Sequence, residues 1–277
     1  MPFSKLGLSN PIVKAIKELG YINPTPIQKR AIPVVLASRD LVATAQTGTG
    51  KTAAFVLPLL ERLNNKEQVR AKSIRALILA PTRELSIQVA ENVAEYSKNL
   101  NLSSMVAYGG VDTAPQAERL LEGVDILVAT PGRLLDLAYQ RAVYFDDVEI
   151  LVLDEADRMM DMGFGTEITK ILDRLPENRQ NLLFSATMND SVRSLAGSFA
   201  YSNLTDAVVD ISITPKSSAA STINQWLITI DKDTKSTLLS HLINNEKWDQ
   251  ALIFIEKKHG AAKLVDQLAK RGIKADS

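Results

Sequence analysis

"LVATAQTGTGKTAAFVLPLLERL", residues 41–63, joins a short apolar run to a longer apolar-rich segment through a turn that contains two glycines. The run at 41–44 predicts a buried strand, and the segment at 53–63 predicts a helix. The same alternation continues along the chain, with further strand candidates at 76–80, 105–108, 126–129, 150–153, 181–184 and 208–211. Strands alternating with helices predict an α/β fold with a mainly parallel sheet flanked by helices on both faces.

The turn itself has the pattern of a phosphate-binding loop. It consists of Ala45, Gln46, Thr47, Gly48, Thr49, Gly50, Lys51 and Thr52, with alanine in place of the pattern's first glycine. Gly48 and Gly50 let successive N–H groups face a phosphate, Lys51 would reach its β and γ oxygens, and the Thr52 hydroxyl would ligate Mg²⁺. A Gly/Thr-rich turn with a solvated lysine is the alternative, but the position between a strand and a helix favours a nucleotide site.

Three carboxylates follow the strand candidate at 150–153, in the stretch "LVLDEAD". Taken alone this is an acidic loop at a strand end. Beside a phosphate loop, Asp154 would hold Mg²⁺ through a water molecule, and Glu155 would orient and deprotonate the attacking water. Asp157 lies too far along to share the metal and needs another partner. "SAT", Ser185 to Thr187, is by itself an ordinary turn. After a phosphate loop and an acidic strand end, its hydroxyls could bond Asp157, and the segment would then act as a coupling element.

Composition narrows the class of protein. The 277 residues are 45% hydrophobic and include no cysteine, which excludes a disulfide framework and a thiolate metal site. No apolar run approaches the ~18 residues of a membrane span, and the first residues lack a signal-peptide pattern. We therefore expect a cytoplasmic protein without a membrane partner. Net charge is zero, so binding of nucleic acid would need a local site of backbone amides and a few basic side chains.

The motifs together resemble those of DEAD-box RNA helicases. "AQTGTGKT", "PTRELSIQ", "GG", "TPGR", "DEAD" and "SAT" stand in that family's order, and "GYINPTPIQ", residues 20–28, resembles its adenine-recognising element. "GGVD", "LVATPGRLLDL" and "DEADRMMDMGF" are most similar to the bacterial RhlE type. The resemblance implies RecA-like P-loop domains and an ATP-dependent RNA helicase that uses ATP and Mg²⁺ to unwind or remodel short RNA duplexes.

The resemblance also implies roles for residues. Gln28 would pair with the adenine edge, and Phe3 would stack on the adenine ring. An RNA backbone site, which reads no base sequence, would be lined by Pro81, Thr82, Arg83, Gly110, Thr130 and Arg133. Thr82 and Thr130 also have the positions of helix caps, and helix N-termini with arginines make good phosphate sites.

By the same resemblance, residues 1–210 would form a first RecA-like domain, 211–224 a linker and 225–277 an incomplete second domain. In the last part we expect strands at 225–230 and 251–255 and helices at 234–244 and 260–270. Ser86 and Glu256 depart from the family pattern. Nothing follows Ser277, so the second domain's arginines are missing, and we expect this chain to be a fragment that binds adenine nucleotide weakly and does not unwind RNA.

Two other functions remain open at this point. A DNA-directed translocase or recombinase-like ATPase would share the phosphate loop, but "PTPIQ" and "SAT" argue against it. A non-catalytic nucleic-acid clamp or partner-binding fragment would not need Lys51 and Glu155, which are both present.

Overall fold

The computed structural model describes residues 2–64, 69–199, 208–213, 224 and 226–277. The chain divides into two compact units, Met1–Pro215 and Lys216–Ser277. The first unit contains a sheet with helices on its two faces, and the second contains helices.

The first unit is built on a seven-stranded sheet. Its strands are β1 Leu41–Ala45, β2 Ile74–Leu79, β3 Ser104–Ala107, β4 Val124–Ala129, β5 Ile150–Leu153, β6 Gln180–Ser185 and β7 Val209–Ile213. They lie in the order β3-β4-β2-β5-β6-β1-β7, and all the pairings are parallel. The predicted α/β class and all seven strand positions in this unit are confirmed.

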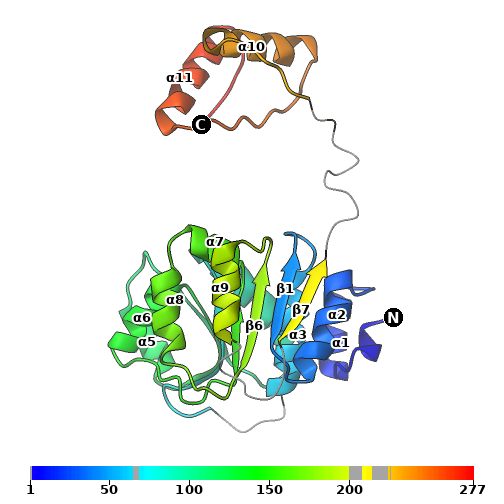
Figure 1. Ribbon diagram of the computed structural model, residues 1–277, viewed down its shortest axis with the longest axis vertical. Helices are drawn as coiled ribbons and strands as arrows, with labels where there is room; N and C mark the ends of the chain where they lie inside the picture. The colour runs from blue at the N-terminus through cyan, green and yellow to red at the C-terminus, as the bar shows by residue number, and fades with distance from the viewer. Residues whose placement is uncertain (1, 65–68, 200–207, 214–223, 225) are drawn as a thin grey trace. The chain divides into compact units, whose positions relative to one another are not determined.

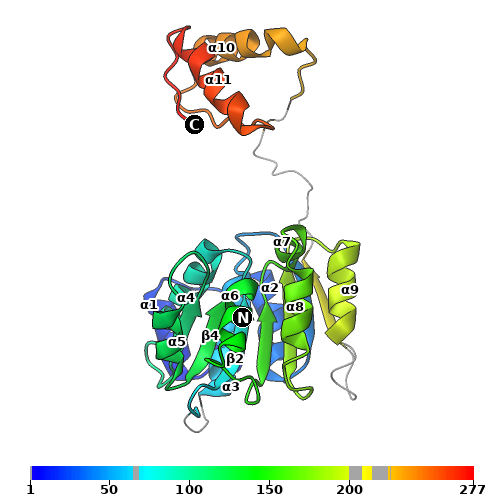
Figure 2. The same ribbon diagram turned by 90° about the vertical axis from the view of Figure 1, so that its left-hand side faces the viewer.

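Helices cover both faces of this sheet (Figures 1 and 2). One face carries a 3₁₀ turn η1 Phe3–Lys5 and helices α1 Asn10–Glu18, α2 Pro26–Leu36, α3 Lys51–Leu63 and α4 Arg83–Ser97. The other carries α5 Ala114–Leu120, α6 Pro131–Tyr139, α7 Ala156–Asp161, α8 Gly165–Leu172 and α9 Asp190–Phe199.

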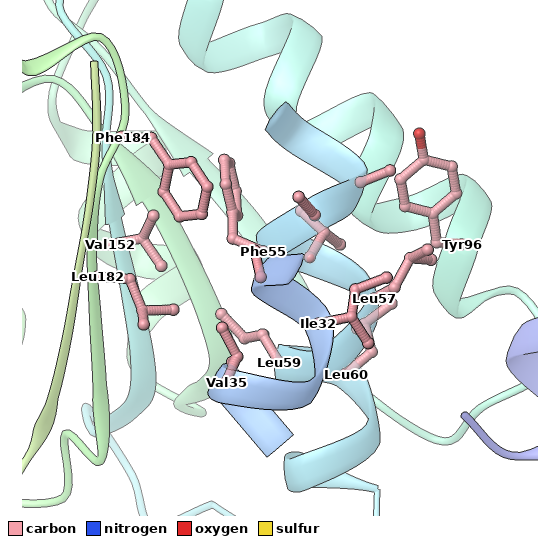
Figure 3. Packing of buried hydrophobic residues seen from close by; sticks show 14 of the residues in the cluster. Ile32, Val35, Phe55, Leu57, Leu59, Leu60, Tyr96, Val152, Leu182 and Phe184 are labelled. Atoms are coloured by element: carbon pink, nitrogen blue, oxygen red, sulfur yellow. The ribbon is translucent and has the colours of Figure 1, made fainter. Parts of the chain in front are cut away.

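Alternation along the strands divides the core into two clusters. In β2, Ala76 and Ile78 face the cluster under α1–α4, whereas Leu77 and Leu79 face the cluster under α5–α9. Because both faces are buried, every residue of β2 is buried and the strand reads as one apolar run. Figure 3 shows α3 on the first face, where the Phe55 ring lies 5.1 Å, between centroids, from that of Phe184 in β6.

The last strand extends beyond the expected domain boundary. β7 pairs with β1 from Leu41↔Val209 to Ala45↔Ile213. Residues 211–213 therefore belong to the sheet and not to the predicted linker, because β1 offers them backbone partners. The remainder of that linker, apart from residue 224, lies outside the described residues.

The second unit differs from expectation in its strands. It contains a 3₁₀ turn η2 Lys232–Thr234 and helices α10 Lys235–Asn245 and α11 Lys258–Ala269, close to the predicted helices. Residues 226–230 and 251–255, predicted as strands, form no β-structure, and residue 225 lies outside the described part. Leu227 is 93% exposed and Phe254 is 87% exposed. Apolar segments with strand propensity become strands only where a neighbouring strand satisfies their backbone groups.

Candidate functional site

Six of the predicted site segments follow strands and meet at one edge of the sheet, whereas Phe3 and Gln28 precede β1. Residues 46–50 follow β1, 80–82 follow β2, 108–112 follow β3, 130 follows β4, 154–155 follow β5 and 186–187 follow β6. Because the strands are parallel, their carboxyl ends share this edge, where open α/β sheets bind ligands. In the sheet, β6 and β1 lie on one side of β5, and β2, β4 and β3 lie on the other. The expected nucleotide and RNA residues thus fall on opposite sides of Asp154 and Glu155.

The phosphate loop has the backbone conformation that its glycines permit. Gly48 and Gly50 have φ values of 78° and 89°, in the left-handed region. Helix α3 begins directly afterwards at Lys51, so its free N–H groups and its dipole point toward the loop. The Lys51 ammonium is buried and donates to the Ala45 carbonyl at 2.7 Å, and Thr49 donates to the Gln46 carbonyl at 2.7 Å. The loop therefore uses its own carbonyls to hold the polar side chains expected to meet phosphate.

Gln28 is buried against the same loop. Its side-chain oxygen accepts from the Thr25 N–H at 2.9 Å and forms a capping box at the start of α2. Its Nε2 donates to the Gly50 carbonyl at 3.1 Å. The amide expected to read an adenine edge is thus engaged within the protein, since burial favours satisfied polar groups.

Phe3, predicted to stack on an adenine ring, is buried. Its ring is buried in the core and meets Tyr21 edge-on, with 6.4 Å between centroids. Tyr21 in turn forms a hydroxyl–hydroxyl hydrogen bond of 3.0 Å with Tyr96 of α4. Burial of the apolar ring in this aromatic cluster is favourable, and stacking of Phe3 on adenine stays a prediction.

The carboxylates after β5 occupy different environments. Asp154 is only 8% exposed, and burial raises its pKa to about 7 despite the opposing charge of Lys51. Glu155 precedes α7 with φ 51° and ψ 51°, a strained conformation for a residue with a side chain. Its N–H donates to Asp154 Oδ1 at 3.0 Å. The turn thus fixes the two carboxylates side by side.

Arg158 is a site residue that the motif analysis missed. Its Nη1 lies 3.3 Å from Glu155 Oε2, one turn along α7. The i, i+3 spacing of opposite charges on a helix was the available signal. In the described structure the expected general base is therefore held by an arginine.

Mg²⁺ suits the oxygen ligands at this position. Thr52 follows Lys51 in the first turn of α3, and Asp154 is a carboxylate whose burial raises its pKa. Among the described residues no group of three or more His, Cys, Asp or Glu could hold a metal. Mg²⁺ does not require such a group, because it commonly binds through one or two protein oxygens, waters and substrate phosphates. The residues present fit this ion.

Asp157 turns away from the metal position toward β6. Its Oδ2 accepts from the Thr187 N–H at 2.9 Å and from the Thr187 hydroxyl at 2.8 Å. Ser185 accepts from the Asp157 N–H at 3.3 Å and donates to the Thr187 carbonyl at 2.7 Å. Burial acts to raise the pKa of Asp157, but the hydrogen bonds from Thr187, Ser185 and Ala186 together outweigh it and leave the pKa below its ordinary value. The contact predicted between "SAT" and Asp157 is present.

On the other side of β5, "PTR" begins α4. Pro81 precedes the cap, and the Thr82 side chain accepts from the Leu85 N–H at 3.3 Å. Arg83 is exposed, and its guanidinium lies 4.7 Å from the centroid of the Tyr108 ring. Tyr108 was not among the predicted site residues. It orients an exposed arginine next to a helix N-terminus, which suits phosphate binding.

Arg133 has a different setting from the one expected. It is buried, donates to the Val111 carbonyl at 2.7 Å and to the Asp112 carbonyl at 3.5 Å, and lies 3.9 Å from an Asp136 oxygen. Its guanidinium thus holds the loop that contains Gly110, whose φ is 82°. Thr130 is at the N-cap of α6 but makes no side-chain capping hydrogen bond. The predicted helix-cap position of Thr130 is therefore confirmed, without a side-chain capping bond.

Comparisons with known proteins agree on one family. The family described as DEAD/DEAH box helicase matches residues 25–195 of this chain. Over 198 residues the chain is 50% identical to the probable ATP-dependent RNA helicase ddx27 of Dictyostelium discoideum, covering 70% of this chain and 25% of that protein. It is 40% identical over 274 residues to the ATP-dependent RNA helicase CshA of Listeria monocytogenes, covering 99% of this chain and 51% of CshA.

A third relative is covered more fully. The ATP-dependent RNA helicase RhlB of Pseudomonas putida is 39% identical over 279 residues, covering 99% of this chain and 69% of RhlB. Against CshA, the chain spans about half the length of its relative. Within the described residues, no helix combines the length and the apolar composition needed to cross a membrane.

Proposed function

Because the chain belongs to the DEAD/DEAH box helicase family, we propose that the protein binds ATP and RNA and couples ATP hydrolysis to local unwinding of RNA duplexes. The observation that carries this proposal is the strand order. It puts the phosphate loop on one side of β5 and the residues expected to meet RNA on the other. Asp154, Glu155 and Asp157 follow β5 and lie between them, and Asp157 contacts Thr187 at the end of β6.

ATP binding would use groups that are already positioned. The N–H groups of the loop at 46–50 and the first turn of α3 meet the phosphates, and Lys51 exchanges its Ala45 carbonyl for phosphate oxygens. Thr52 and Asp154 would hold Mg²⁺, which neutralises phosphate charge when bound. The side-chain amide of Gln28 is hydrogen-bonded to the Gly50 carbonyl in the loop. We propose that Gln28 binds the adenine edge. Its side-chain amide must then hydrogen-bond the base as well as Thr25 and Gly50.

Hydrolysis would use Glu155 as the base for the attacking water. For this, its carboxylate must be released from Arg158. Thr187 and Ser185 contact Asp157 directly, so movement of α7 relative to the end of β6 would connect hydrolysis to the rest of the protein. We propose Asp157, Ser185 and Thr187 as the coupling residues.

RNA would bind through its backbone. Thr82 and Arg83 offer a helix N-terminus and an exposed guanidinium, and Pro81 and Thr130 flank them. Arg133 would act by fixing the loop around Gly110, where peptide groups can approach a phosphate. Contacts of this kind carry no base sequence.

We propose that the protein is of the bacterial RhlE type, on the basis of "GGVD", "LVATPGRLLDL" and "DEADRMMDMGF". We propose a cytoplasmic location, since RNA and ATP are both available there. We also propose that the first unit is a RecA-like ATP-binding domain, which β7 extends to Ile213, and that the second unit is part of a second RecA-like domain.

Single-turnover ATP hydrolysis tests the proposal. In a protein of its relatives' full length, hydrolysis should rise when single-stranded or duplex RNA is added and should not rise with DNA of the same sequence. Lys51→Ala serves as the control for nucleotide binding. Equal stimulation by DNA would favour the DNA-directed translocase, and binding of RNA without any hydrolysis would favour a clamp.

A further inference from the structure

Two exposed tyrosines lie under cations at a place separate from the strand-end site. Tyr139, the last residue of α6, is 58% exposed, and the guanidinium of Arg174 lies 4.9 Å from its ring centroid. Tyr144 is 43% exposed, and the Lys72 ammonium lies 6.0 Å from its ring centroid. We call these four residues together with Arg141 the tyrosine patch. Neither tyrosine contributes to the function proposed above.

One open pocket of about 510 Å³ joins the patch. Both tyrosine rings, Arg141, Arg174 and Phe145 line it, together with the single carboxylate Asp146. Lys72 adds a further positive charge next to Tyr144. The neighbouring Arg70 forms an ion pair with Asp147, so these two residues add no net charge to the patch. Three cations against one carboxylate give a chain of zero net charge a locally positive surface.

The backbone around the patch holds these cations in unusual conformations. Lys72 and Arg141 have φ values of 59° and 55°. The Lys72 carbonyl accepts from the Tyr144 N–H at 2.8 Å, beside an isolated bridge between Ser73 and Tyr144. The Arg141 N–H donates to the Ala138 carbonyl at 3.0 Å. Left-handed backbone at a residue with a side chain costs free energy, and such strain gathers at functional sites.

We propose that the tyrosine patch is a second contact for single-stranded RNA, and this proposal rests on the proposed function. Bases stack on Tyr139 and Tyr144, and phosphates meet Arg141, Arg174 and Lys72. Aromatic rings interleaved with cations are the chemistry that binds single strands without sequence preference. Helix α6 connects the patch to the strand-end site: it has nine residues between Pro131 and Tyr139, or about 14 Å. A strand leaving Thr130 would reach the patch along this helix.

The test compares labelled RNAs of two lengths by fluorescence anisotropy. A short RNA of about 6 nucleotides fills the strand-end site, and one of about 20 nucleotides can also reach the patch. The double variant Tyr139→Ala/Tyr144→Ala should bind the long RNA about 30- to 10⁴-fold more weakly, because two stacked bases lose their rings. Its affinity for the short RNA should be unchanged. The matched control Tyr139→Phe/Tyr144→Phe keeps both rings and should bind the long RNA as the unmutated chain does.

A second variant keeps the rings and removes charge. Arg141→Gln/Arg174→Gln should reduce the slope of log affinity against log salt by about 0.7 for each phosphate that no longer meets a cation, for the long RNA alone. Thermal unfolding of each variant checks that the fold is intact. Full affinity of the alanine double variant for the long RNA would overturn the inference and leave the proposed function standing. Failure of the unmutated chain to bind either RNA would overturn both.

Discussion

The side-chain amide of Gln28 donates a hydrogen bond to the carbonyl oxygen of Gly50, with 3.1 Å between Nε2 and the oxygen. The same amide caps α2 through Thr25. Gln28, which is expected to bind the base, is thus directly bonded to the loop that is expected to bind the phosphates. A nucleotide that moves either of them must act on the other.

Substitution of Gly50 should therefore disrupt both parts at once. A Cβ at Gly50 would lie 2.5 Å from Gln28 Nε2, and φ is 89°. Gly48 also has a positive φ, of 78°, but a Cβ there meets nothing within 4 Å. Gly50→Ala should lower ATP affinity and stability more than Gly48→Ala, since both add strain and Gly50 alone adds a clash. Calorimetric ATP titrations and thermal unfolding measure this. Equal effects of the two variants would show that the Gln28 contact is unimportant.

Asp154→Asn should stabilise the chain at neutral pH in the absence of Mg²⁺. Burial raises the folded-state pKa of Asp154 from 3.8 to about 7. Between these values the folded state keeps a proton that the unfolded state has released, so the free energy of unfolding falls as pH rises. Asparagine does not titrate, so the advantage of the variant should grow from about pH 4 to 7 and then level off.

Urea unfolding at several pH values measures that advantage. The unmutated chain is the reference, because its other carboxylates contribute equally to both proteins. An advantage that stays constant from pH 4 to pH 8 would contradict the assigned titration.

In a protein of the relatives' full length, Glu155→Gln should slow ATP hydrolysis by a factor on the order of 10²–10⁴, the range for removal of a general base. ATP affinity should change little, since Glu155 does not belong to the phosphate loop. Arg158→Ala is the matched control: it breaks the same ion pair, at 3.3 Å, but keeps the carboxylate. Single-turnover hydrolysis distinguishes the two. If Arg158→Ala were as slow as Glu155→Gln, the ion pair and not the base would account for the slower hydrolysis.

Thr187→Val should weaken the connection between α7 and β6. It removes the 2.8 Å hydroxyl bond to Asp157 but keeps the backbone N–H, at a cost of about 0.5–1.5 kcal/mol. The folded-state pKa of Asp157 is lowered, so its stabilisation is present at neutral pH and is lost as pH falls through that pKa. The difference between variant and unmutated chain should therefore shrink in acid. Thr187→Ser, which retains the hydroxyl, should behave as the unmutated chain in chemical unfolding at pH 7 and pH 3.

Arg133→Ala should loosen the loop that carries Gly110. It removes the donor to the Val111 and Asp112 carbonyls. Both residues are exposed, so water replaces the donor and the loss should cost about 0.5–1.5 kcal/mol. Hydrogen exchange should speed up at residues 109–112, and RNA affinity should fall. Arg83→Ala removes an exposed charge instead and should lower RNA affinity without faster exchange in that loop. Unchanged exchange in Arg133→Ala would assign the arginine to RNA directly.

The sequence by itself determined the elements of the first unit and the chemistry of the phosphate loop. Strands at 41–45 and 150–153 are short apolar runs bounded by polar turns, and this pattern is local. The glycines of the loop permit their backbone conformation without help from other residues. For the same reason helices α10 and α11 were predicted near their observed positions.

Only the tertiary structure decided how these elements meet. Strand order, which places β5 between the two halves of the site, depends on pairing between residues far apart in the sequence. Burial decided that Phe3 packs on Tyr21 and that Gln28 binds Gly50. Residues 226–230 and 251–255 have the pattern of strands but lack backbone partners among the described residues. A strand is stable only when another chain segment pairs with it, and no local pattern specifies that segment.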